Sequence, residues 1–596
     1  MTEADVPRWE KRFRAGRVGL PEWAEDAPDR CVVEATVAGV LEVHSFEAAS
    51  GELRRLTDRP EGTSSATIDH AGEFVWWFDD TAGDEYGVWR RQPFGSAPGT
   101  SVEDPLGLPA AYPAGLSMGR SGVVVVGSQD DDYGTRIDVV RDGRARRVYE
   151  HREDAWAGDL SPDEQWLAIA HSEHGDSRHP DLRVLLLADG STVAELSDGP
   201  GKGVSPLGFS PVPGDPRLLV EHERHGRAEL LVLDVLTGAE TPVELGVPGE
   251  VAGAEWTRDG SGLVVLLDHE ARTLAHRVTL GTAAVEAIGP TTGSVGGATA
   301  RPDGDVWLTW SSSATPSVVR NLAGDVLLRA PGEPAPESVE VRDVWVEGEG
   351  GRIHALLRLP AGADGPVPVP LPLVVEVHGG PTAHDTDAFR PYCATWVDEG
   401  FAVVQVNYRG STGYGSVWRD ALEARVGHVE LADIAAVADH LVAEGIADPR
   451  RLVLAGASWG GFLTLLGLGT QPQRWALGLA GVPVADYVAA YEDEMEGLKA
   501  FDRSLFGGSP SEVPEKYADS SPLTYVDAVT APVLVLAGRN DPRCPIRQID
   551  NYLERLDARG ATHEVYRYDA GHGSLLDDER VRQMRVELDF IARHLP

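Results

Sequence analysis

The sequence predicts two domains, an N-terminal β-propeller followed by a C-terminal α/β domain with a mostly parallel, doubly wound sheet. Three observations lead to this fold class. Short apolar strands, each introduced by a turn, recur every 42 to 50 residues over the first half of the chain. After Pro336, apolar strands alternate instead with helical stretches. The length of 596 residues excludes a single small domain, because domains usually contain roughly 100–200 residues.

The repeating region is expected to be a propeller of seven blades. Six turns rich in Gly, Pro, Asp or Ser each precede an apolar strand, and in order these strands are FVWWF, VVVVG, WLAIA, RLLVE, LVVLL and VWLTW. A partial unit over about residues 33–60 adds the seventh blade. The alternative is a row of β-sandwiches, but sandwiches do not keep so regular a period.

The second region is expected to be a parallel sheet covered by helices. Between its strands, the segment LADIAAVADHLVAEG places apolar side chains at helical spacing on one face. Strands that alternate with helices imply parallel pairing with both faces of the sheet covered. The expected strands are residues 371–377, 402–408, 451–455, 477–482, 532–538 and 563–568.

These patterns divide the chain into three parts. Residues 32–336 are assigned to the propeller and residues 337–596 to the α/β domain. Residues 1–31 form an N-terminal segment that could pack on the α/β domain.

Composition narrows the function classes. The formal net charge of −41 repels phosphate backbones and anionic lipid heads, so neither nucleic acid nor a membrane is an expected partner. Only 3 cysteines are present, without a CxxC pair, which fits a reducing compartment. No apolar signal segment or membrane-length apolar run is seen, and a cytoplasmic protein is expected. Whether the chain forms a homo-oligomer is left open.

A candidate nucleophile lies in Gly456-Ala457-Ser458-Trp459-Gly460, which fits the pattern GxSxG of a nucleophile elbow. Glycines are needed there because the strand-to-helix turn leaves no room for side chains beside the serine. The pattern alone is weak, and residues 115–119 also match it. That second match precedes the strand VVVV rather than a helix, whereas Ser458 follows the strand RLVLA and opens a helix. Ser458 is therefore the expected nucleophile of an α/β-hydrolase domain.

Partners for this serine follow in the order that such domains use. A serine hydroxyl needs a histidine to accept its proton, and the histidine needs a carboxylate to orient it. Asp541 follows the strand PVLVLAG, and His572 follows HEVYRYDA between two glycines. We expect Ser458, Asp541 and His572 to form a catalytic triad.

Acyl transfer also needs donors for the developing oxyanion. The strand at residues 371–377 runs into His378-Gly379-Gly380-Pro381, where glycines let backbone N–H groups approach a ligand. The expected donors are the backbone N–H groups of Gly380 and Trp459. Two short His/Glu clusters, at residues 171–174 and 222–225, are interpreted as polar blade edges rather than metal sites, so no metal and no cofactor are expected.

Six motifs together resemble the catalytic domain of the prolyl oligopeptidase family of serine peptidases, within it the acylaminoacyl-peptidase and aminopeptidase-like branch. They are HGGP (378–381), NYRGSTGYG (407–415), GASWGG (456–461), SPLTYV (521–526), GRNDPRCP (538–545) and GHG (571–573). The resemblance implies that Ser458 is the nucleophile, His572 the general base and Asp541 its orienting carboxylate. It also implies a propeller that shields the site. The oligopeptidase and dipeptidyl-peptidase branches place a tyrosine hydroxyl where this chain has HGGP, so their narrower specificities are not implied.

The resemblance implies a peptidase that hydrolyses short peptides or aminoacyl amides through an acyl-enzyme and removes N-terminal residues. In the resembled family, the region around residues 491–496 borders the substrate pocket, and Glu494 or Glu496 is a candidate partner for a substrate ammonium group. A solvated acidic helix start is the simpler interpretation of these residues. Two alternatives stay open. One is an amidase or esterase acting on an aminoacyl small molecule such as an aminonucleoside antibiotic, and the other is a catalytically silent propeller scaffold.

Overall fold

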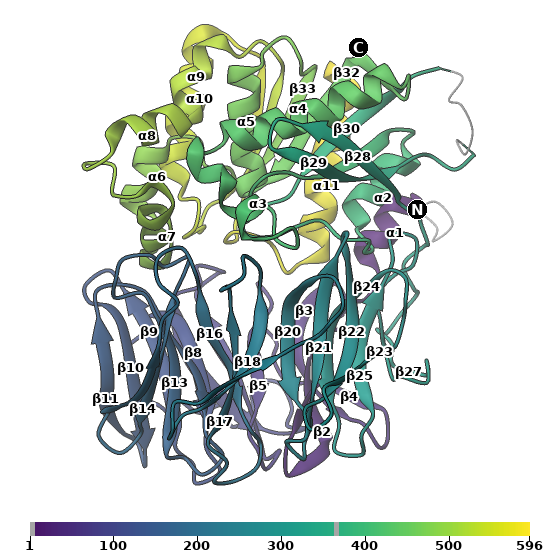
Figure 1. The fold of residues 1–596 in the computed structure, drawn as a ribbon. Helices are drawn as coiled ribbons and strands as arrows, with labels where there is room; N and C mark the ends of the chain where they lie inside the picture. Colours follow the sequence, from purple (N-terminus) through teal and green to yellow (C-terminus); the bar gives the residue numbers. More distant parts are fainter. Residues whose placement is uncertain (1–5, 363–368, 596) are drawn as a thin grey trace.

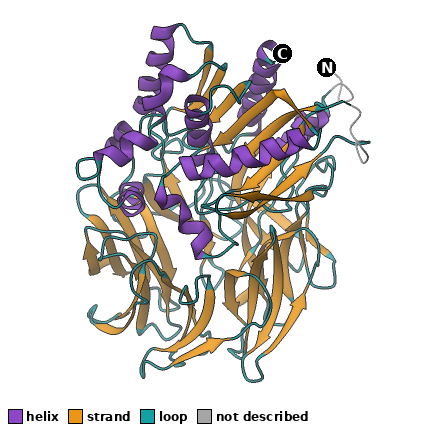
Figure 2. Ribbon diagram, turned by 45° about the horizontal axis from the view of Figure 1, so that its top comes forward, coloured by secondary structure: helices purple, strands orange, loops and turns teal. Residues whose placement is uncertain are grey.

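The computed structural model describes residues 6–362 and 369–595. A propeller of strands lies below an α/β domain (Figure 1). Helix α1 precedes the propeller in the sequence but lies beside α2 of the upper domain. Helices gather in the upper part, whereas the lower part consists of strands (Figure 2). The predicted fold class is confirmed. No helix within the described ranges is long and apolar enough to cross a membrane.

Seven antiparallel sheets, one per blade, make up the described propeller. In chain order the blades are β1 (Glu22–Ala24), β2 (Ala27–Val37), β3 (Val40–Glu47), β4 (Glu52–Arg55); β5 (Ala66–Ile68), β6 (Phe74–Asp80), β7 (Gly87–Pro93); β8 (Tyr112–Met118), β9 (Val124–Asp130), β10 (Gly134–Arg141), β11 (Arg144–His151); β12 (Ala155–Leu160), β13 (Trp166–His171), β14 (Asp181–Leu186), β15 (Thr192–Leu196); β16 (Val204–Phe209), β17 (Arg217–His222), β18 (Glu229–Asp234), β19 (Glu240–Val243); β20 (Glu250–Trp256), β21 (Gly262–His269), β22 (Arg272–Thr279), β23 (Ala284–Ile288); and β24 (Ser294–Ala300), β25 (Val306–Ser311), β26 (Val318–Arg320), β27 (Val326–Leu328).

The first blade begins earlier than the sequence suggests. Strand β1 starts at Glu22 and pairs with β2, so the expected boundary at residue 32 falls inside β2. Strand β1 has only three residues, and β2 opens with the polar stretch Ala27–Arg30. Neither β1 nor this opening stretch of β2 carries the apolar pattern that marks the other strands, so the sequence places the start of the blade too late.

The first and last blades meet through side chains. As described, β1–β4 and β24–β27 form separate sheets with no shared strand. The Arg301 guanidinium lies 3.8 Å from the ring centre of Trp307 and 4.9 Å from that of Trp23. The indole N–H of Trp23 donates to Thr299 Oγ1 at 3.0 Å. An aromatic and cationic contact therefore closes the ring of blades.

One eight-stranded sheet forms the described core of the C-terminal domain. Its spatial order is β28-β29-β31-β30-β32-β33-β34-β35, antiparallel as far as β31 and parallel beyond it. The bounds are β28 (Arg342–Gly348), β29 (Gly351–Arg358), β30 (Leu371–Val377), β31 (Ala402–Asn407), β32 (Ala447–Ala457), β33 (Leu477–Gly481), β34 (Val533–Gly538) and β35 (His563–Tyr568). Strand β30 lies between β31 and β32, so the strand order reverses there, and ligands of such sheets bind at the carboxyl ends beside a reversal.

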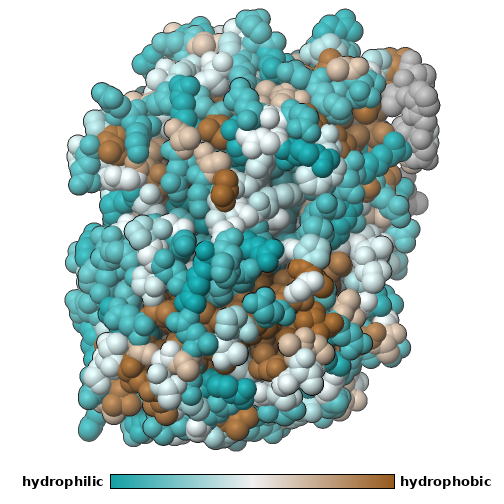
Figure 3. All heavy atoms as spheres, viewed as in Figure 1, coloured by the Kyte–Doolittle hydropathy of each residue, from teal (hydrophilic) through white to brown (hydrophobic). Residues whose placement is uncertain are grey.

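Helices cover both faces of this sheet. Alternate residues of β30 face opposite ways, so that Leu373 joins a core with α4 and α5, whereas Val374 joins a second core that contains Trp9 of α1 and Phe590 of α11. The helices are α1 (Arg8–Arg14), α2 (Pro391–Asp398), α3 (Ser416–Asp420), α4 (His428–Ala443), α5 (Trp459–Thr470), α6 (Tyr487–Asp493), α7 (Glu496–Phe506), α8 (Pro514–Ser520), α9 (Pro522–Tyr525), α10 (Ile546–Arg559) and α11 (Asp577–His594), with short 3₁₀ turns η2 (Ala421–Ala424) and η3 (Val526–Ala528). Polar residues cover most of the face of the molecule drawn in Figure 3, in keeping with the high net charge.

Candidate active site

Ser458 occupies the sharp turn between β32 and α5. Its backbone has φ 57° and ψ −120°, a strained conformation for a residue with a side chain, at a cost of about 1–3 kcal/mol. A Cβ on Gly460 would lie 2.0 Å from the Val377 carbonyl oxygen, and one on Gly456 would lie 2.6 Å from the same atom. Both glycines are therefore required by space, and the turn presents Ser458 at the carboxyl edge of the sheet.

Asp541 and His572 meet on the loops that follow β34 and β35. His572 Nδ1 lies 2.8 Å from Asp541 Oδ2. Asp541 is buried, and its other oxygen accepts the backbone N–H groups of Arg543 and Cys544, each at 2.9 Å. These bonds fix the carboxylate and the ring. With Nδ1 engaged, Nε2 is the nitrogen available for proton transfer.

The HGGP segment packs against the turn that carries Ser458. A Cβ on Gly379 would lie 3.3 Å from Ser458 Cβ and 3.8 Å from the Trp459 nitrogen. Gly380 has φ 124°, which favours glycine, and its bond to Pro381 is cis. The predicted oxyanion donors thus belong to segments in mutual contact.

His378 supports this loop from behind. Its ring stacks on Tyr408 with centroids 4.3 Å apart, and its Nε2 lies 2.8 Å from Ser411 Oγ. The Tyr408 hydroxyl donates to the His378 carbonyl oxygen at 3.0 Å. Burial lowers the pKa of His378 to about 4, so the ring is neutral at pH 7 and holds the loop rather than acting as a second base.

The propeller packs directly on the loop that carries His572. A Cβ on Gly571 would lie 1.8 Å from the carbonyl oxygen of Gly83, which belongs to the hairpin between β6 and β7. On the other side of His572, the Leu575 carbonyl oxygen accepts the Leu41 N–H at 3.0 Å. Blades 1 and 2 therefore hold the histidine loop on both sides.

The neighbouring aspartate loop is held in the same way. Glu85, in the β6–β7 hairpin, pairs with Arg543 at 2.8 Å, and Asn540 Nδ2 donates to the Ala82 carbonyl oxygen at 3.3 Å. Both contacts flank Asp541 in the sequence. The geometry of the Asp541–His572 pair therefore depends on contacts that cross the domain boundary.

The two candidate glutamates have different surroundings. Both are 4% exposed, but Glu496 pairs with Arg152 at 3.0 Å and with Arg503 at 3.3 Å. Oε1 of Glu494 has no hydrogen-bond partner among the described residues. Met495, between them, donates its backbone N–H to the Pro542 carbonyl oxygen at 3.0 Å, so this segment adjoins the loop of Asp541.

Asp502 of α7 is a neighbour of Glu494 that the sequence analysis did not single out. It is 5% exposed, and its Oδ2 is likewise unpartnered within the described part of the chain. Burial and the nearby Asp502 carboxylate raise the pKa of Glu494 well above its usual range, and burial raises that of Asp502 to about 8. The helical periodicity of α7 places Asp502 on its buried face. A single acidic residue at such a position is too common in sequences to indicate a site.

Cys544 lies close to the Asp541–His572 pair. One potential ligand atom from each of the three residues lies within 4.8 Å of the other two. Burial raises the pKa of the Cys544 thiol well above its usual range, so the thiol stays protonated at neutral pH. Since Asp541 already accepts three hydrogen bonds, this set does not favour a metal ion.

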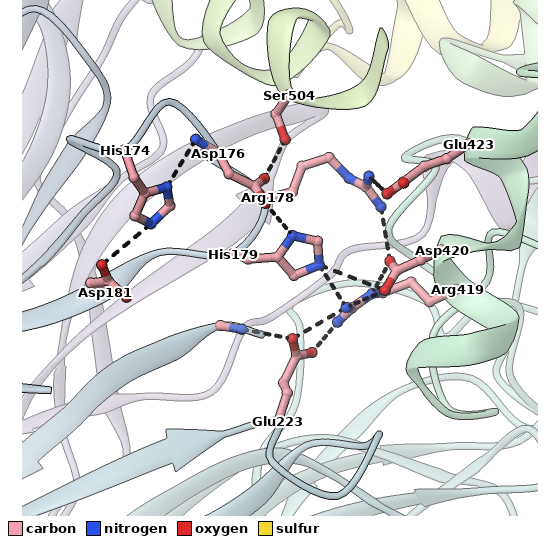
Figure 4. A network of polar contacts seen from close by, with 11 residues as sticks. His174, Asp176, Arg178, His179, Asp181, Glu223, Arg419, Asp420, Glu423 and Ser504 are labelled. Carbon is pink, nitrogen blue, oxygen red and sulfur yellow. Dashed lines mark hydrogen bonds and ion pairs between the residues drawn. The ribbon is translucent and has the colours of Figure 1, made fainter. Parts of the chain in front are cut away.

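A polar network joins the propeller to α3 and α7 of the α/β domain (Figure 4). His179 Nδ1 lies 2.9 Å from Asp176 Oδ2, and Asp176 accepts the Ser504 hydroxyl of α7 at 2.5 Å. Arg419, at the end of α3, contacts His179 and Glu223 of the propeller. Blades 4 and 5 are thereby fixed to α3 and α7.

Ion pairs lie in the central cavity of the propeller. A cavity of about 400 Å³ is lined by residues from the innermost strand of every blade. At this cavity, Glu25 pairs with Arg120, with Arg258 at 2.9 Å and with His70 at 3.4 Å. These pairs link the first blade to three others across the axis.

Comparisons with known proteins agree with this geometry. Residues 388–596 match the prolyl oligopeptidase family. A dipeptidyl aminopeptidase BIII of Pseudoxanthomonas mexicana is 26% identical over 94% of this chain and 84% of its own length. An acylamino-acid-releasing enzyme of Rattus norvegicus is 31% identical over 41% of this chain, and the chain spans only a third of that relative.

Among solved structures, a puromycin-hydrolysing peptidase of Mycobacterium tuberculosis has a TM-score of 0.84 at 22% identity and covers 99% of this chain and 96% of its own. At this identity the likeness speaks for the fold alone. The sequence match, the two-domain fold and the predicted triad motifs lead to one conclusion. Residues 388–596 carry a domain of the prolyl oligopeptidase family, a family of serine peptidases.

Proposed function

We propose that the protein removes N-terminal residues with a free amino group from short peptides, through an acyl-enzyme on Ser458. The Ser458 Oγ attacks the scissile carbonyl carbon, while His572 Nε2 accepts the hydroxyl proton and Asp541 stabilises the resulting imidazolium. The backbone N–H groups of Gly380 and Trp459 donate to the oxyanion. His572 then gives its proton to the leaving amine, and water releases the acyl group by the same steps in reverse.

The observation that supports the specificity is the buried Oε1 atom of Glu494, which has no hydrogen-bond partner among the residues that the structure describes. A buried carboxyl without a hydrogen-bond partner costs free energy unless a ligand supplies one, and a substrate ammonium group is such a ligand. Glu494 belongs to the segment that contacts the Asp541 loop, which suits an amine close to the scissile bond. Glu496 is the weaker candidate because two arginines already occupy its carboxylate. The relative named a dipeptidyl aminopeptidase supports a preference for free amino groups.

A substrate panel tests this proposal. Aminoacyl p-nitroanilides with free and with acetylated amino groups are compared for the parent, Glu494→Gln and Glu496→Gln. Losing a charge-assisted hydrogen bond costs about 1.5–3 kcal/mol, so Glu494→Gln is expected to raise KM for free amines roughly 10- to 100-fold. KM for acetylated substrates is expected to stay within about twofold. Equal effects on both substrate types would overturn the amine assignment.

The same panel addresses the alternative of an amidase or esterase. Puromycin, an aminoacyl amide with a free amino group, and p-nitrophenyl esters are added as further substrates. Turnover of esters alone would contradict the peptidase specificity proposed here. A fluorophosphonate probe should label the parent and not Ser458→Ala, and labelling of both variants would remove Ser458 from its proposed role.

A further inference from the structure

Helix α7 is the part of the α/β domain that lies across blades 3 and 4. Lys499 Nζ is 3.3 Å from Asp131 in the β9–β10 hairpin, and Ser504 donates to Asp176 near the other end of the helix (Figure 4). A Cβ on Gly497 would lie 3.1 Å from Gln129 Oε1 of β9. The helix is thus fixed to the propeller along its length.

The start of α7 is held by a network of four charges that crosses the domain boundary. Arg152, between β11 and β12, places Nη2 3.0 Å from Glu496 Oε2 and donates from Nη1 to the Asp131 carbonyl oxygen at 2.5 Å. Arg503 reaches the other oxygen of Glu496 at 3.3 Å and pairs with Glu153 of the propeller at 3.0 Å. Each domain contributes one arginine and one glutamate.

Because of this network, the neighbouring carboxyl groups of Glu494 and Glu496 have different surroundings. The Glu496 side chain is 5% exposed, whereas that of Arg152 is 53% exposed, so the propeller arginine covers a buried carboxylate from outside. Glu494 precedes Glu496 by two residues and has no such partner in the described chain. Without Arg152, the charge of Glu496 would be balanced by Arg503 alone, and the start of α7 would lose its contact with the β11–β12 loop.

We propose that Arg152 is a positioning residue for substrate specificity, supplied by the propeller to the amine site of the catalytic domain. By occupying Glu496 it fixes the first residue of α7 and with it the preceding Glu494. It also prevents Glu496 from competing for the ammonium group. This inference rests on the proposed role of Glu494.

A double-mutant cycle on the full-length protein tests the proposal. Arg152→Gln is expected to raise KM for free-amine anilides about 3- to 10-fold, with kcat and the kinetics of acetylated substrates within twofold of the parent. In the cycle, Arg152→Gln is expected to change KM little when Glu496→Gln is already present, because the ion pair that Arg152 makes is then already lost. Arg147→Gln, which removes a propeller surface arginine paired with Glu150, is the matched control.

The outcomes separate this inference from the proposed function. If Glu494→Gln acts only on free amines while Arg152→Gln leaves every KM unchanged, the role of Arg152 is wrong and that of Glu494 stands. If Arg152→Gln lowers kcat on both substrate types, the residue supports the fold or the triad rather than specificity. If Glu494→Gln affects both substrate types equally, the amine site itself is wrong. Fully additive effects of Arg152→Gln and Glu496→Gln on KM would contradict a positioning role carried by the ion pair.

Discussion

Gly83 of the propeller and Gly571 of the catalytic domain pack backbone against backbone, next to His572. A Cβ on Gly83 would lie 2.9 Å from the Gly571 nitrogen, and one on Gly571 would lie 1.8 Å from the Gly83 carbonyl oxygen. Neither residue can carry a side chain without moving the histidine loop. The position of the proposed general base therefore depends on the propeller.

Gly83→Ala should reduce kcat/KM on every substrate by about 10- to 100-fold, because a displacement of about 1 Å in a catalytic group is that costly. Steady-state kinetics and the rate of fluorophosphonate labelling measure the effect. Gly143→Ala is the matched control, since Gly143 has a similar φ of 67° but open space around its Cβ position. Equal losses in both variants would point to backbone strain instead of the contact with Gly571.

The binding of free amines should weaken at low pH. Burial raises the pKa values of Glu494 and Asp502, and Lys499 and Arg503 oppose this rise at Glu494 while Glu496 adds to it. Below these pKa values the carboxyls are neutral and attract an ammonium group less. The ratio of KM for free-amine substrates to KM for acetylated ones should therefore rise as pH falls through the raised pKa of Glu494.

Taking this ratio cancels any effect of pH on the chemical step, because both substrate types share that step. Asp502→Asn should lower the pH at which the ratio changes, because it removes the neighbouring carboxylate that raises the pKa of Glu494. A ratio that stays constant between pH 6 and 9 would contradict binding of the ammonium group by ionised carboxylates.

Stability should decline as pH rises towards about 8, for a reason unrelated to catalysis. Glu587 of α11 is buried, and burial raises its pKa to about 8, against roughly 4.3 in an unfolded chain. Its contribution is fully present below the unfolded pKa and is lost as pH rises through 8. Glu587→Gln should therefore gain Tm relative to the parent at pH 9 and show little difference at pH 5. The exposed Glu554→Gln is the control for thermal unfolding at both pH values.

Tyr408→Phe should slow the chemical step without weakening substrate binding. The variant loses the hydrogen bond to the His378 carbonyl oxygen and keeps the stacked ring, so the HGGP loop is held less firmly. A lost hydrogen bond of about 1 kcal/mol predicts roughly a fivefold drop in kcat with KM unchanged. An effect on KM alone would show that the hydroxyl serves the binding pocket instead.

Local sequence patterns predict both folds, and they predict a catalytic triad of Ser458, Asp541 and His572 from the place of each residue after a strand. Each of these residues directly follows an apolar strand, and strand order in an α/β sheet brings the carboxyl ends of neighbouring strands together. The hydrogen bond between His572 and Asp541 agrees with that expectation. The regular spacing of turns likewise led to seven blades, although β1 was missed because it is too short to show a pattern.

The surroundings of the glutamates could not be predicted in the same way. Arg152 and Glu496 are 344 residues apart in the sequence, and no local pattern links them. Choosing between Glu494 and Glu496 needed the arginines that the propeller and α7 bring to one of them. Asp502 became visible only when burial and missing hydrogen-bond partners were known. Contacts between side chains of the two domains cannot be predicted from patterns in a single sequence.

The meeting of α1 with α11 also bears on how the chain is assembled. Trp9 and Phe13 share one apolar core with Phe590 and Ile591 of the last helix. During synthesis, α1 emerges before the propeller and the catalytic domain, so this core cannot form until α11 has also been made. Packing of α1 is therefore a late step of folding, and it connects the segment before the propeller to α11 of the catalytic domain.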